Sequence, residues 1–334
     1  MVIPVYTYQV TSCSVTKGCG VHVYTYSINT KPIIMQSRFY ISILLIVSIA
    51  CHRAAMPSAT PVVNAEIQND RKQTILAGHC TISILQAKNY KEWYDKSYNA
   101  YQTDTNTIEQ LKPLLTGKTI EIFMGSWCGD SKREVPRMYK ILQQAGMDTN
   151  QVRLIFVDNS LKAYKQSPQH EEQGKNIHHV PTMIVYDGNK EKGRIIESPV
   201  VSLEKDLLAI LTTQTYTPNY KAVAWWLAHA KHKTHKLKNE QLQVMVTTLQ
   251  PLCKDFGEFN AYGYMLLAKK NYKEALNVFR LNTLLYPAYA GAYDSLGEVY
   301  YTIGDIAEAR KNYEKVLSMQ PDNANAKKML EKMK

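Results

Sequence analysis

Apolar and polar positions follow two different periods along the chain, and the change of period divides it into two regions. From about residue 90 to residue 213, short β-rich runs alternate with stretches of helical spacing. Thr119 to Met124 and Val152 to Val157 have the length and composition of buried strands. Between them, Val135 and Met138 lie on one face of a predicted helix. A helix that joins two such strands predicts a parallel pair with a right-handed crossover.

Further segments extend this α/β order on both sides. Gln73 to Leu85 alternates loosely around a glycine and predicts a short hairpin, whereas Asn89 to Gln102 and Thr105 to Leu115 have helical patterns. The residues Asp187-Gly188-Asn189 between two apolar runs indicate a β-hairpin. Ser202 to Leu211 begins with a Ser cap and is amphipathic, so a helix is predicted after the hairpin.

From residue 218 to residue 334 nearly every segment has a helical pattern, and part of the pattern repeats. Two stretches superpose, at about residues 259–292 and 293–326. Small residues recur where two helices must approach closely, and a proline recurs where the second helix ends. The matching pairs are Gly263 with Gly297, Ala275 with Ala309, Phe279 with Tyr313 and Pro287 with Pro321. This pattern resembles the tetratricopeptide repeat (TPR), which implies an all-α array with a concave face for peptides or protein segments.

Two repeats are fewer than the about three that usually make a stable array. Tyr220 to His232 and Asn239 to Leu249 are therefore interpreted as a degenerate helix pair that stacks beneath them, and Asn323 to Met333 as a polar capping helix. Three histidines recur every three residues on a predicted basic helix, namely His229, His232 and His235. We interpret them as part of a solvated face rather than as a metal site.

A short apolar run near the start of the chain has the pattern of an export signal. Residues 35–50 carry one Arg and then an apolar run from Phe39 to Ala50, shorter than the about 20 residues that span a membrane. The run ends directly before Cys51. It resembles a bacterial lipoprotein signal, which implies lipidation of Cys51, export, and anchoring in the periplasm or cell envelope. Ser48 and Ala50 equally suit an ordinary signal peptidase, so secretion without lipid stays open.

The segments on either side of this signal are interpreted from it. Because a signal peptide stands at the N-terminus, residues 1–34 are interpreted as a non-native extension, with translation starting at Met35. Residues 51–72 are interpreted as a linker, because Ala54 to Asn64 is rich in small residues and Pro. The alternative is that the apolar run forms one buried helix near the start of the chain.

Composition adds few constraints on function. The chain is 45% hydrophobic with 15 Gly and 13 Pro, as expected of a globular protein, and its formal net charge is +11. The basic residues are scattered, and no stripe of Arg and aromatic residues of the kind that grips nucleic acid is present. We therefore predict a solvated basic surface, no nucleic-acid partner, and neither a metal nor a cofactor.

The sequence GSWCGDSKREVP, from Gly125 to Pro136, holds the candidate chemistry. It leads from the strand that ends at Met124 into the predicted helix, so Cys128 stands at the helix N-terminus. The positive end of the helix dipole and its unpaired backbone N–H groups stabilise a thiolate there. Gly129 permits a tight turn, and Ser131 is placed to donate its O–H to the sulfur. We therefore predict that Cys128 is a nucleophile.

The strands, this motif and a second proline loop together resemble the thioredoxin fold over about residues 74–213. Trp127 precedes the cysteine as in the family's WCGPC, and Pro136 stands where thioredoxins carry a helix-kinking proline. The stretch NIHHVPT resembles the family's loop whose proline is cis and packs against the reactive sulfur. The resemblance implies that role for Pro181, with Val180 directly before it.

Three departures from the family pattern limit what the motif can do. Ser131 replaces the second cysteine, so the motif alone cannot resolve a mixed disulfide. Ile122 replaces the buried Asp that assists the second thiol, and strand alternation turns the adjacent Glu121 to the other face. Asp130 replaces the family's Pro and should disfavour a thiolate beside it, although it can also cap exposed N–H groups.

Three routes could supply the missing step. Cys80 or Cys253 could act as a resolving thiol, although isolated cysteines in a globular chain are more often inert core residues. Small glutathione-like thiols or a partner protein could release the adduct. Otherwise the protein does no turnover, and the fold serves as a binding platform.

His178 and His179 could support the thiolate as imidazolium, or they could hold a metal together with Cys128. We favour a third interpretation, in which both are polar residues on a loop before the proline.

We therefore expect an α/β thioredoxin-like domain followed by an all-α TPR array. The leading hypothesis is an exported protein, anchored to a membrane through lipid, in which Cys128 forms mixed disulfides with protein thiols or peptides that the repeats present. The competing hypothesis is a redox-inactive adaptor whose thioredoxin-like domain is structural and whose repeats bind the partner. The reactivity of Cys128 decides between these hypotheses. If Cys128 is reactive, the protein is an enzyme of the thiol-disulfide oxidoreductase or isomerase class.

Overall fold

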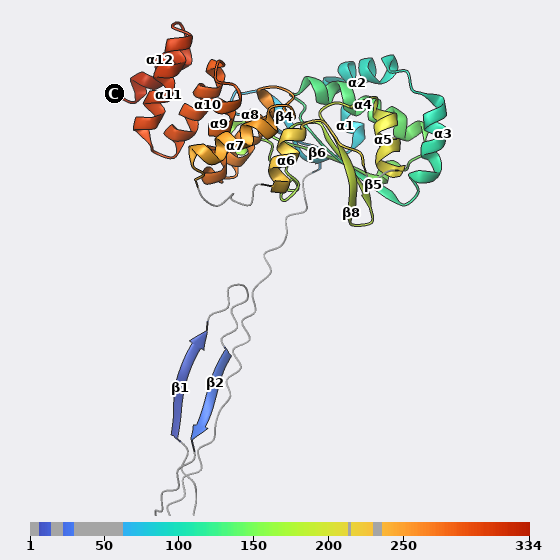
Figure 1. The fold of residues 1–334 in the computed structure, drawn as a ribbon. Coiled ribbons are helices and arrows are strands. Elements are labelled where there is room, and N and C mark those ends of the chain that lie inside the picture. The colour runs from blue at the N-terminus through green and yellow to red at the C-terminus, as the bar shows by residue number, and fades with distance from the viewer. Residues whose placement is uncertain (1–6, 15–22, 30–62, 213–214, 230–235) are drawn as a thin grey trace, which may run out of the picture. The chain divides into compact units, whose positions relative to one another are not determined.

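The computed structural model describes residues 7–14, 23–29, 63–212, 215–229 and 236–334 (Figure 1). The chain forms two compact units, Met1–Ser58 and Ala59–Lys334. In the first unit, strands β1 (Thr7–Ser14) and β2 (Val23–Asn29) pair antiparallel, within residues that the sequence analysis interpreted only as an extension. The predicted signal segment and Cys51 lie outside the described residues.

The second unit begins with a mixed sheet of six strands. The strands are β3 (Ala65–Gln68), β4 (Thr74–Cys80), β5 (Lys118–Met124), β6 (Val152–Phe156), β7 (Thr182–Asp187) and β8 (Lys190–Ile196), in the order β3-β4-β6-β5-β7-β8. β5 and β6 run parallel, as predicted, and the other neighbours are antiparallel. β7 and β8 form the predicted hairpin around Gly188.

At the N-terminal edge of this sheet, one prediction from the sequence is wrong. Residues 73–85 do not form a hairpin, because β4 is one continuous strand and Ile82–Leu85 is a single helical turn, α1. Gly78 does not turn the chain: it has a φ of +73° inside β4 and still pairs with Phe156. Only glycine adopts this conformation without a steric cost. The strand that pairs with β4 in a hairpin is β3, which lies in residues assigned to the linker.

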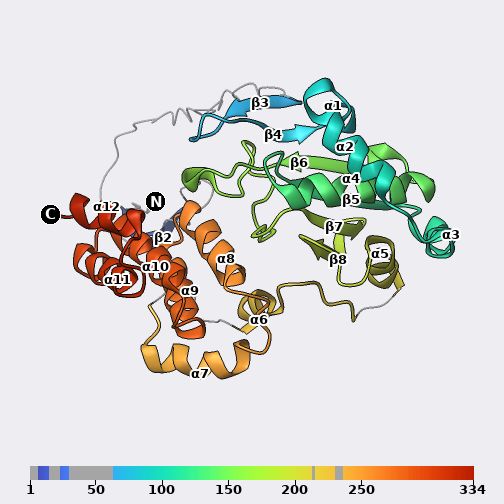
Figure 2. The same ribbon diagram turned by 90° about the horizontal axis from the view of Figure 1, so that it is seen from above.

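Helices cover one face of the sheet, and Figure 2 shows α2 and α4 running alongside the strands. The helices α2 (Lys88–Ala100), α3 (Thr105–Leu114), α4 (Gly129–Gln144) and α5 (Leu203–Thr212) stand where the sequence predicted them. Val135 and Met138 of α4 bury against Ile122 in this core. The opposite face carries a smaller core around Phe123, against which Cys128 packs. The candidate cysteine therefore lies on the face that these helices leave free.

The rest of the second unit is helical in all its regular elements, as expected of a TPR array. The helices are α6 (Lys221–His229), α7 (Asn239–Leu249), α8 (Gly257–Ala268), α9 (Tyr272–Leu285), α10 (Ala290–Thr302), α11 (Ile306–Met319) and α12 (Ala324–Lys332). A Cβ on Gly263 would lie 2.7 Å from the Phe279 ring, and one on Gly297 would lie 3.0 Å from Tyr313. The repeated glycines thus let the paired helices approach, for the reason that the repeat pattern indicated.

Two further observations concern the histidines of the predicted basic face and the possibility of a membrane-spanning helix. His229 is exposed on α6 and stacks on Trp225 with ring centroids 4.5 Å apart, whereas His232 and His235 lie outside the described residues. A search of the described helices finds none whose length and apolar character would let it cross a bilayer.

Candidate functional site

The loop between β5 and α4 presents the cysteine at the helix start. The Cys128 N–H donates to the Gly125 carbonyl at 3.0 Å, and Cys128 is the N-cap residue of α4. Gly125 leaves room for an aromatic ring, because a Cβ there would lie 2.4 Å from the Trp127 indole. Trp127 then donates from Nε1 to the Val157 carbonyl at 2.9 Å, which ties the loop to the end of β6. The Gly-Ser-Trp-Cys segment therefore holds Cys128 between the ends of β5 and β6.

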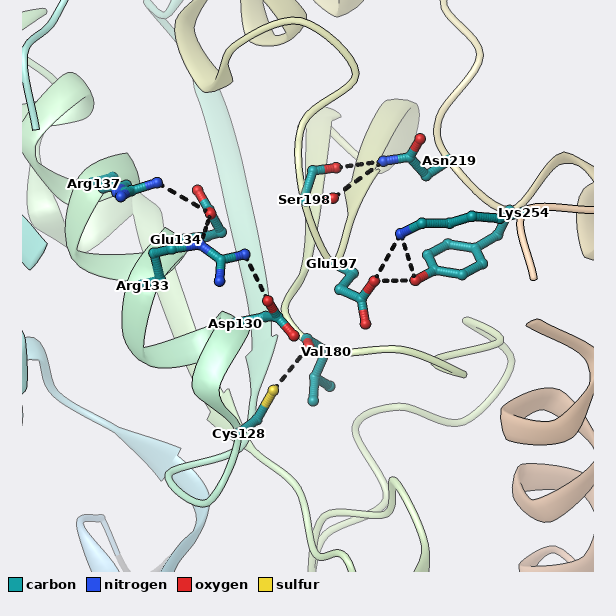
Figure 3. A network of polar contacts seen from close by, with 11 residues as sticks. Cys128, Asp130, Arg133, Glu134, Arg137, Val180, Glu197, Ser198, Asn219 and Lys254 are labelled. Carbon is teal, nitrogen blue, oxygen red and sulfur yellow. Dashed lines mark hydrogen bonds and ion pairs between the residues drawn. The ribbon is translucent and has the colours of Figure 1, made fainter. Parts of the chain in front are cut away.

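The Cys128 sulfur lies against the loop before β7, as the resemblance implied. Sγ donates to the Val180 carbonyl oxygen at 3.3 Å, and the peptide bond between Val180 and Pro181 is cis (Figure 3). The side chain is partly exposed. In this protonated state the sulfur caps no N–H group of α4, so the helix acts on it through its dipole alone.

Ser131 has a different partner from the one predicted. Its side chain is fully buried, and its Oγ accepts a hydrogen bond from the Gly125 N–H at 3.2 Å. No hydrogen bond joins it to Cys128 in the described part of the chain. The hydroxyl therefore helps to hold the loop. Gly129 is exposed at the start of α4, and Pro136 is buried within that helix.

The charge of Asp130 is largely neutralised by a neighbour. Its carboxylate pairs with Arg133 at 2.6 Å, and Arg133 also contacts the buried Glu134 at 2.5 Å (Figure 3). Because Arg133 stands on the same helical turn, it weakens the repulsion that Asp130 would exert on a thiolate.

A buried lysine that the sequence analysis did not single out stands beside the cysteine. Lys165 is 5% exposed, and its Nζ lies 4.4 Å from the centre of the Trp127 ring and 4.9 Å from that of Tyr164. Burial lowers the pKa of the Lys165 ammonium to about 8, and the neighbouring Cys128 opposes this shift by favouring the charged form. A positive charge in this position stabilises a thiolate.

The backbone of Lys165 lies in the left-handed region. Its φ of +58° is uncommon outside Gly, Asn and Asp. No periodicity or motif in residues 158–177 distinguishes this lysine from the exposed ones. Its burial against Trp127 depends on tertiary packing, so local sequence carries no signal.

The TPR region contacts the site from two sides. Tyr164, which contacts Lys165, lies 6.1 Å from Tyr264 of α8, measured between ring centres. Beyond the proline loop, Glu197 pairs with Lys254 at 3.1 Å (Figure 3). The thioredoxin-like sheet and the helical array therefore meet next to the cysteine.

His178 and His179 stand on the loop before Pro181, as favoured, and they also belong to this contact. His179 stacks on Tyr220 at 3.8 Å, and His178 meets the edges of Tyr220 and Tyr262. Burial lowers the pKa of His178 to about 3 and that of His179 well below its ordinary value. Neutral rings cannot support a thiolate as imidazolium. No metal-binding group of three or more His, Cys, Asp or Glu side chains occurs in the described ranges.

Neither candidate resolving thiol lies at the site. Cys80 is 2% exposed in the core under the helices, whereas Cys128 packs on the core of the opposite face. Cys253 packs against the core of the TPR helices. Burial raises the pKa of both the Cys80 and the Cys253 thiol to about 12. At neutral pH both are therefore poor nucleophiles.

Strand alternation turns Ile122 and Glu121 to opposite faces of the sheet, as predicted. Ile122 is fully buried in the core under the helices. Glu121 points to the other face, where it pairs with Arg153 at 2.6 Å and Lys175 at 2.5 Å. Among the described residues, no carboxylate takes the place of the family's buried Asp at position 122.

Comparisons with known proteins agree with this geometry. Residues 82–204 match the family described as thioredoxin, and residues 290–323 match the family described as tetratricopeptide repeat. A comparison with curated proteins found no match. The chain therefore contains a thioredoxin-like domain and a TPR region, as the sequence predicted.

Proposed function

We propose that this protein performs thiol-disulfide exchange through one reactive cysteine, Cys128, with partner proteins that its TPR region holds. One observation carries the proposal. The partly exposed sulfur stands at the start of α4, 3.3 Å from the Val180 carbonyl and next to a cis proline. A thiolate there attacks a partner disulfide, so one partner sulfur bonds to Sγ and the other leaves as a thiolate.

The contact between the two regions supports the coupling of chemistry to recognition. TPR arrays bind peptides or protein segments. Because Tyr264 of α8 packs against Tyr164 at the site, a segment held by the array lies close to Cys128. Both domains thus favour a redox or protein-interaction role, and their junction favours the two together.

The direct test uses a peptide that contains a disulfide. The wild-type protein, incubated with an excess of it, is expected to gain at Cys128 the mass of one half of the peptide and to lose this mass on reduction. Peptide mapping by mass spectrometry measures both changes. A folded protein that stays unmodified at Cys128 would contradict the proposal.

A redox-inactive adaptor is the second candidate function. It is favoured by the separation of the thiols, since Cys80 and Cys253 lie in other cores and cannot resolve an adduct. In that case the protein would bind its partners with equal affinity as wild type and as Cys128→Ala, and no disulfide-linked complex would form.

A cysteine at position 131 is expected to restore the two-thiol cycle. Ser131→Cys places a second thiol three residues into the motif, where attack on a Cys128 adduct closes an intramolecular disulfide and releases the partner. We expect insulin reduction with dithiothreitol to rise about tenfold or more over wild type. Ser131→Ala is the matched control, and equal rates for the two variants would show that the loop does not bring the positions together.

We also propose export and lipid anchoring at Cys51. The support is the apolar run from Phe39 to Ala50 followed directly by a cysteine. In a bacterial host, mass spectrometry of the membrane fraction is expected to find an N-terminal Cys51 that carries acyl chains. A membrane-free mature chain that retains residues 1–34 would contradict this proposal.

A further inference from the structure

The proline loop that contacts the Cys128 sulfur is itself held by the residue that follows β8. The Glu197 N–H donates to the Pro181 carbonyl oxygen at 2.6 Å. Glu197 has a φ of +63°, which is uncommon in residues other than Gly. One residue before Pro181, the Val180 carbonyl accepts from Sγ at 3.3 Å. The backbone of Glu197 therefore fixes one side of the loop that the sulfur meets.

The side chain of Glu197 is bound by two residues of the TPR region. Its carboxylate accepts from the Tyr220 hydroxyl and from the Lys254 ammonium, the latter at 3.1 Å (Figure 3). The same ammonium donates to the Tyr220 oxygen at 3.3 Å and lies 4.8 Å from the centre of its ring. Burial and the hydrogen bond to Glu197 raise the pKa of the Tyr220 hydroxyl, so it stays protonated and donates. Each of the three side chains therefore contacts the other two.

Tyr220 also contacts the proline loop directly. Its buried ring stacks on the His179 ring with centres 3.8 Å apart, and His179 directly precedes Val180. Asn219, which precedes Tyr220, donates to the Ser198 carbonyl at 2.9 Å. The segment that leads into α6 is therefore bonded both to the proline loop and to the chain after β8.

Lys254 is fixed in turn by a buried carboxylate of the TPR region. Its backbone N–H donates to one oxygen of Glu258 at 2.9 Å, and the other oxygen accepts from the Val223 N–H, also at 2.9 Å. Glu258 lies on α8, is fully buried, and Val223 lies on α6. The starts of α6 and α8 are therefore tied together, and the two groups that bind Glu197 come from this pair.

We propose that Tyr220 and Lys254 are positioning residues for the exchange at Cys128. They act through Glu197, which holds the loop of Pro181. The inference rests on the proposed exchange function and adds residues of the TPR region to its site. Attack on a disulfide needs the three sulfur atoms in line, so a wrong direction of approach slows it. A loop held against Sγ fixes that direction.

Two reagents separate positioning from ionisation of the cysteine. On the full chain at pH 7, one measurement gives the rate of adduct formation with the disulfide peptide, and the other gives the rate of alkylation of Cys128 by iodoacetamide. Both reactions need the thiolate, so a change in its amount alters the two rates equally. Only the peptide is large enough to depend on the fixed loop. The ratio of peptide rate to iodoacetamide rate therefore reports positioning.

Two variants remove the contacts with Glu197. Tyr220→Phe deletes the hydroxyl but keeps the ring on His179, and Lys254→Met deletes the ammonium but keeps an apolar stem. In each variant the ratio is expected to fall about five- to tenfold, the effect of about one net hydrogen bond. Lys254→Arg keeps the charge and is expected to recover most of the ratio.

Matched variants remove the same groups elsewhere in the TPR region. Tyr289→Phe deletes the hydroxyl of an exposed tyrosine, and Lys221→Met deletes an ammonium at an exposed position next to Tyr220. Both are expected to keep the wild-type ratio. Circular dichroism checks that each variant is folded. If Tyr220→Phe is unfolded, the comparison of Lys254→Met with Lys254→Arg decides.

The outcomes separate this inference from the exchange function. Folded Tyr220→Phe and Lys254→Met proteins that keep the full ratio would show that the network only joins two domains, and the inference would be wrong. Equal losses in both rates would leave the ratio unchanged and would likewise exclude positioning. A wild-type chain that is alkylated but forms no adduct would overturn the exchange function, and this inference with it.

Discussion

Replacement of Cys128 by serine is expected to abolish mixed-disulfide formation with the disulfide peptide within residues 63–334. In residues 63–334 the other thiols are Cys80 and Cys253, and burial raises the pKa of each to about 12. At pH 7 such a thiol is ionised to about one part in 100,000, and only the thiolate attacks. Mass spectrometry of the reacted protein measures the loss.

The paired controls keep Cys128 and remove the other thiols one at a time. Cys80→Ala and Cys253→Ala are expected to form the adduct at the wild-type rate, since neither residue lies at the site. Circular dichroism checks that Cys80→Ala remains folded, because that side chain is in the core. An adduct on Cys128→Ser, mapped to residue 253, would show that the TPR region carries the reactive thiol instead.

Replacement of Lys165 by methionine is expected to slow the alkylation of Cys128 by iodoacetamide at pH 7 about tenfold. Methionine preserves the apolar stem against Trp127 but removes the buried charge that favours the thiolate. A tenfold loss corresponds to about 1.4 kcal/mol, which is modest for a charge pair in a partly buried site.

The pH dependence separates this electrostatic role from a structural one. Burial lowers the pKa of Lys165 to about 8, so the side chain is charged below this pH and progressively neutral above it. The rate difference between wild type and Lys165→Met should therefore be largest below about pH 8 and shrink above it. Neighbouring Cys128, Glu197 and Asp130 favour the ammonium and keep its pKa from falling further, whereas His178 and His179 stay neutral.

Two variants control for packing. Lys165→Arg keeps the charge and is expected to recover most of the rate, and Lys162→Met removes a charge from an exposed position on the same loop with little effect. A loss in Lys165→Met that is equal at every pH would indicate disturbed packing and would rule out charge stabilisation.

The sequence predicted the parts of the site that depend on local pattern. A strand followed by an N-terminal helix cap puts Cys128 at the start of α4, and the small Gly125 makes room for Trp127. The proline loop was found through its resemblance to a known family, and its contact bridges 52 positions along the chain, from Cys128 to Val180. Spacing alone does not predict a contact of that range.

The error at Gly78 and the unpredicted packing of the histidines share one cause. A glycine between apolar residues suits a turn and a strand equally, and only the pairing of Gly78 with Phe156 distinguishes them. Similarly, His178 and His179 stand on a loop before a proline, and the local pattern does not show that Tyr220 packs against both rings and Tyr262 against His178. In each case the deciding partner lies far away in the sequence.

The sequence by itself determined most of the strands and helices after residue 87, where the helical repeats stand, and that one sulfur begins a helix. These features depend on periodicity, caps and small residues, all of which act between near neighbours. Only the tertiary structure decided which side chains carry charge beside that sulfur. It buries Lys165 against Trp127 and neutralises His178, because ionisation responds to desolvation and to charges that folding brings from distant segments.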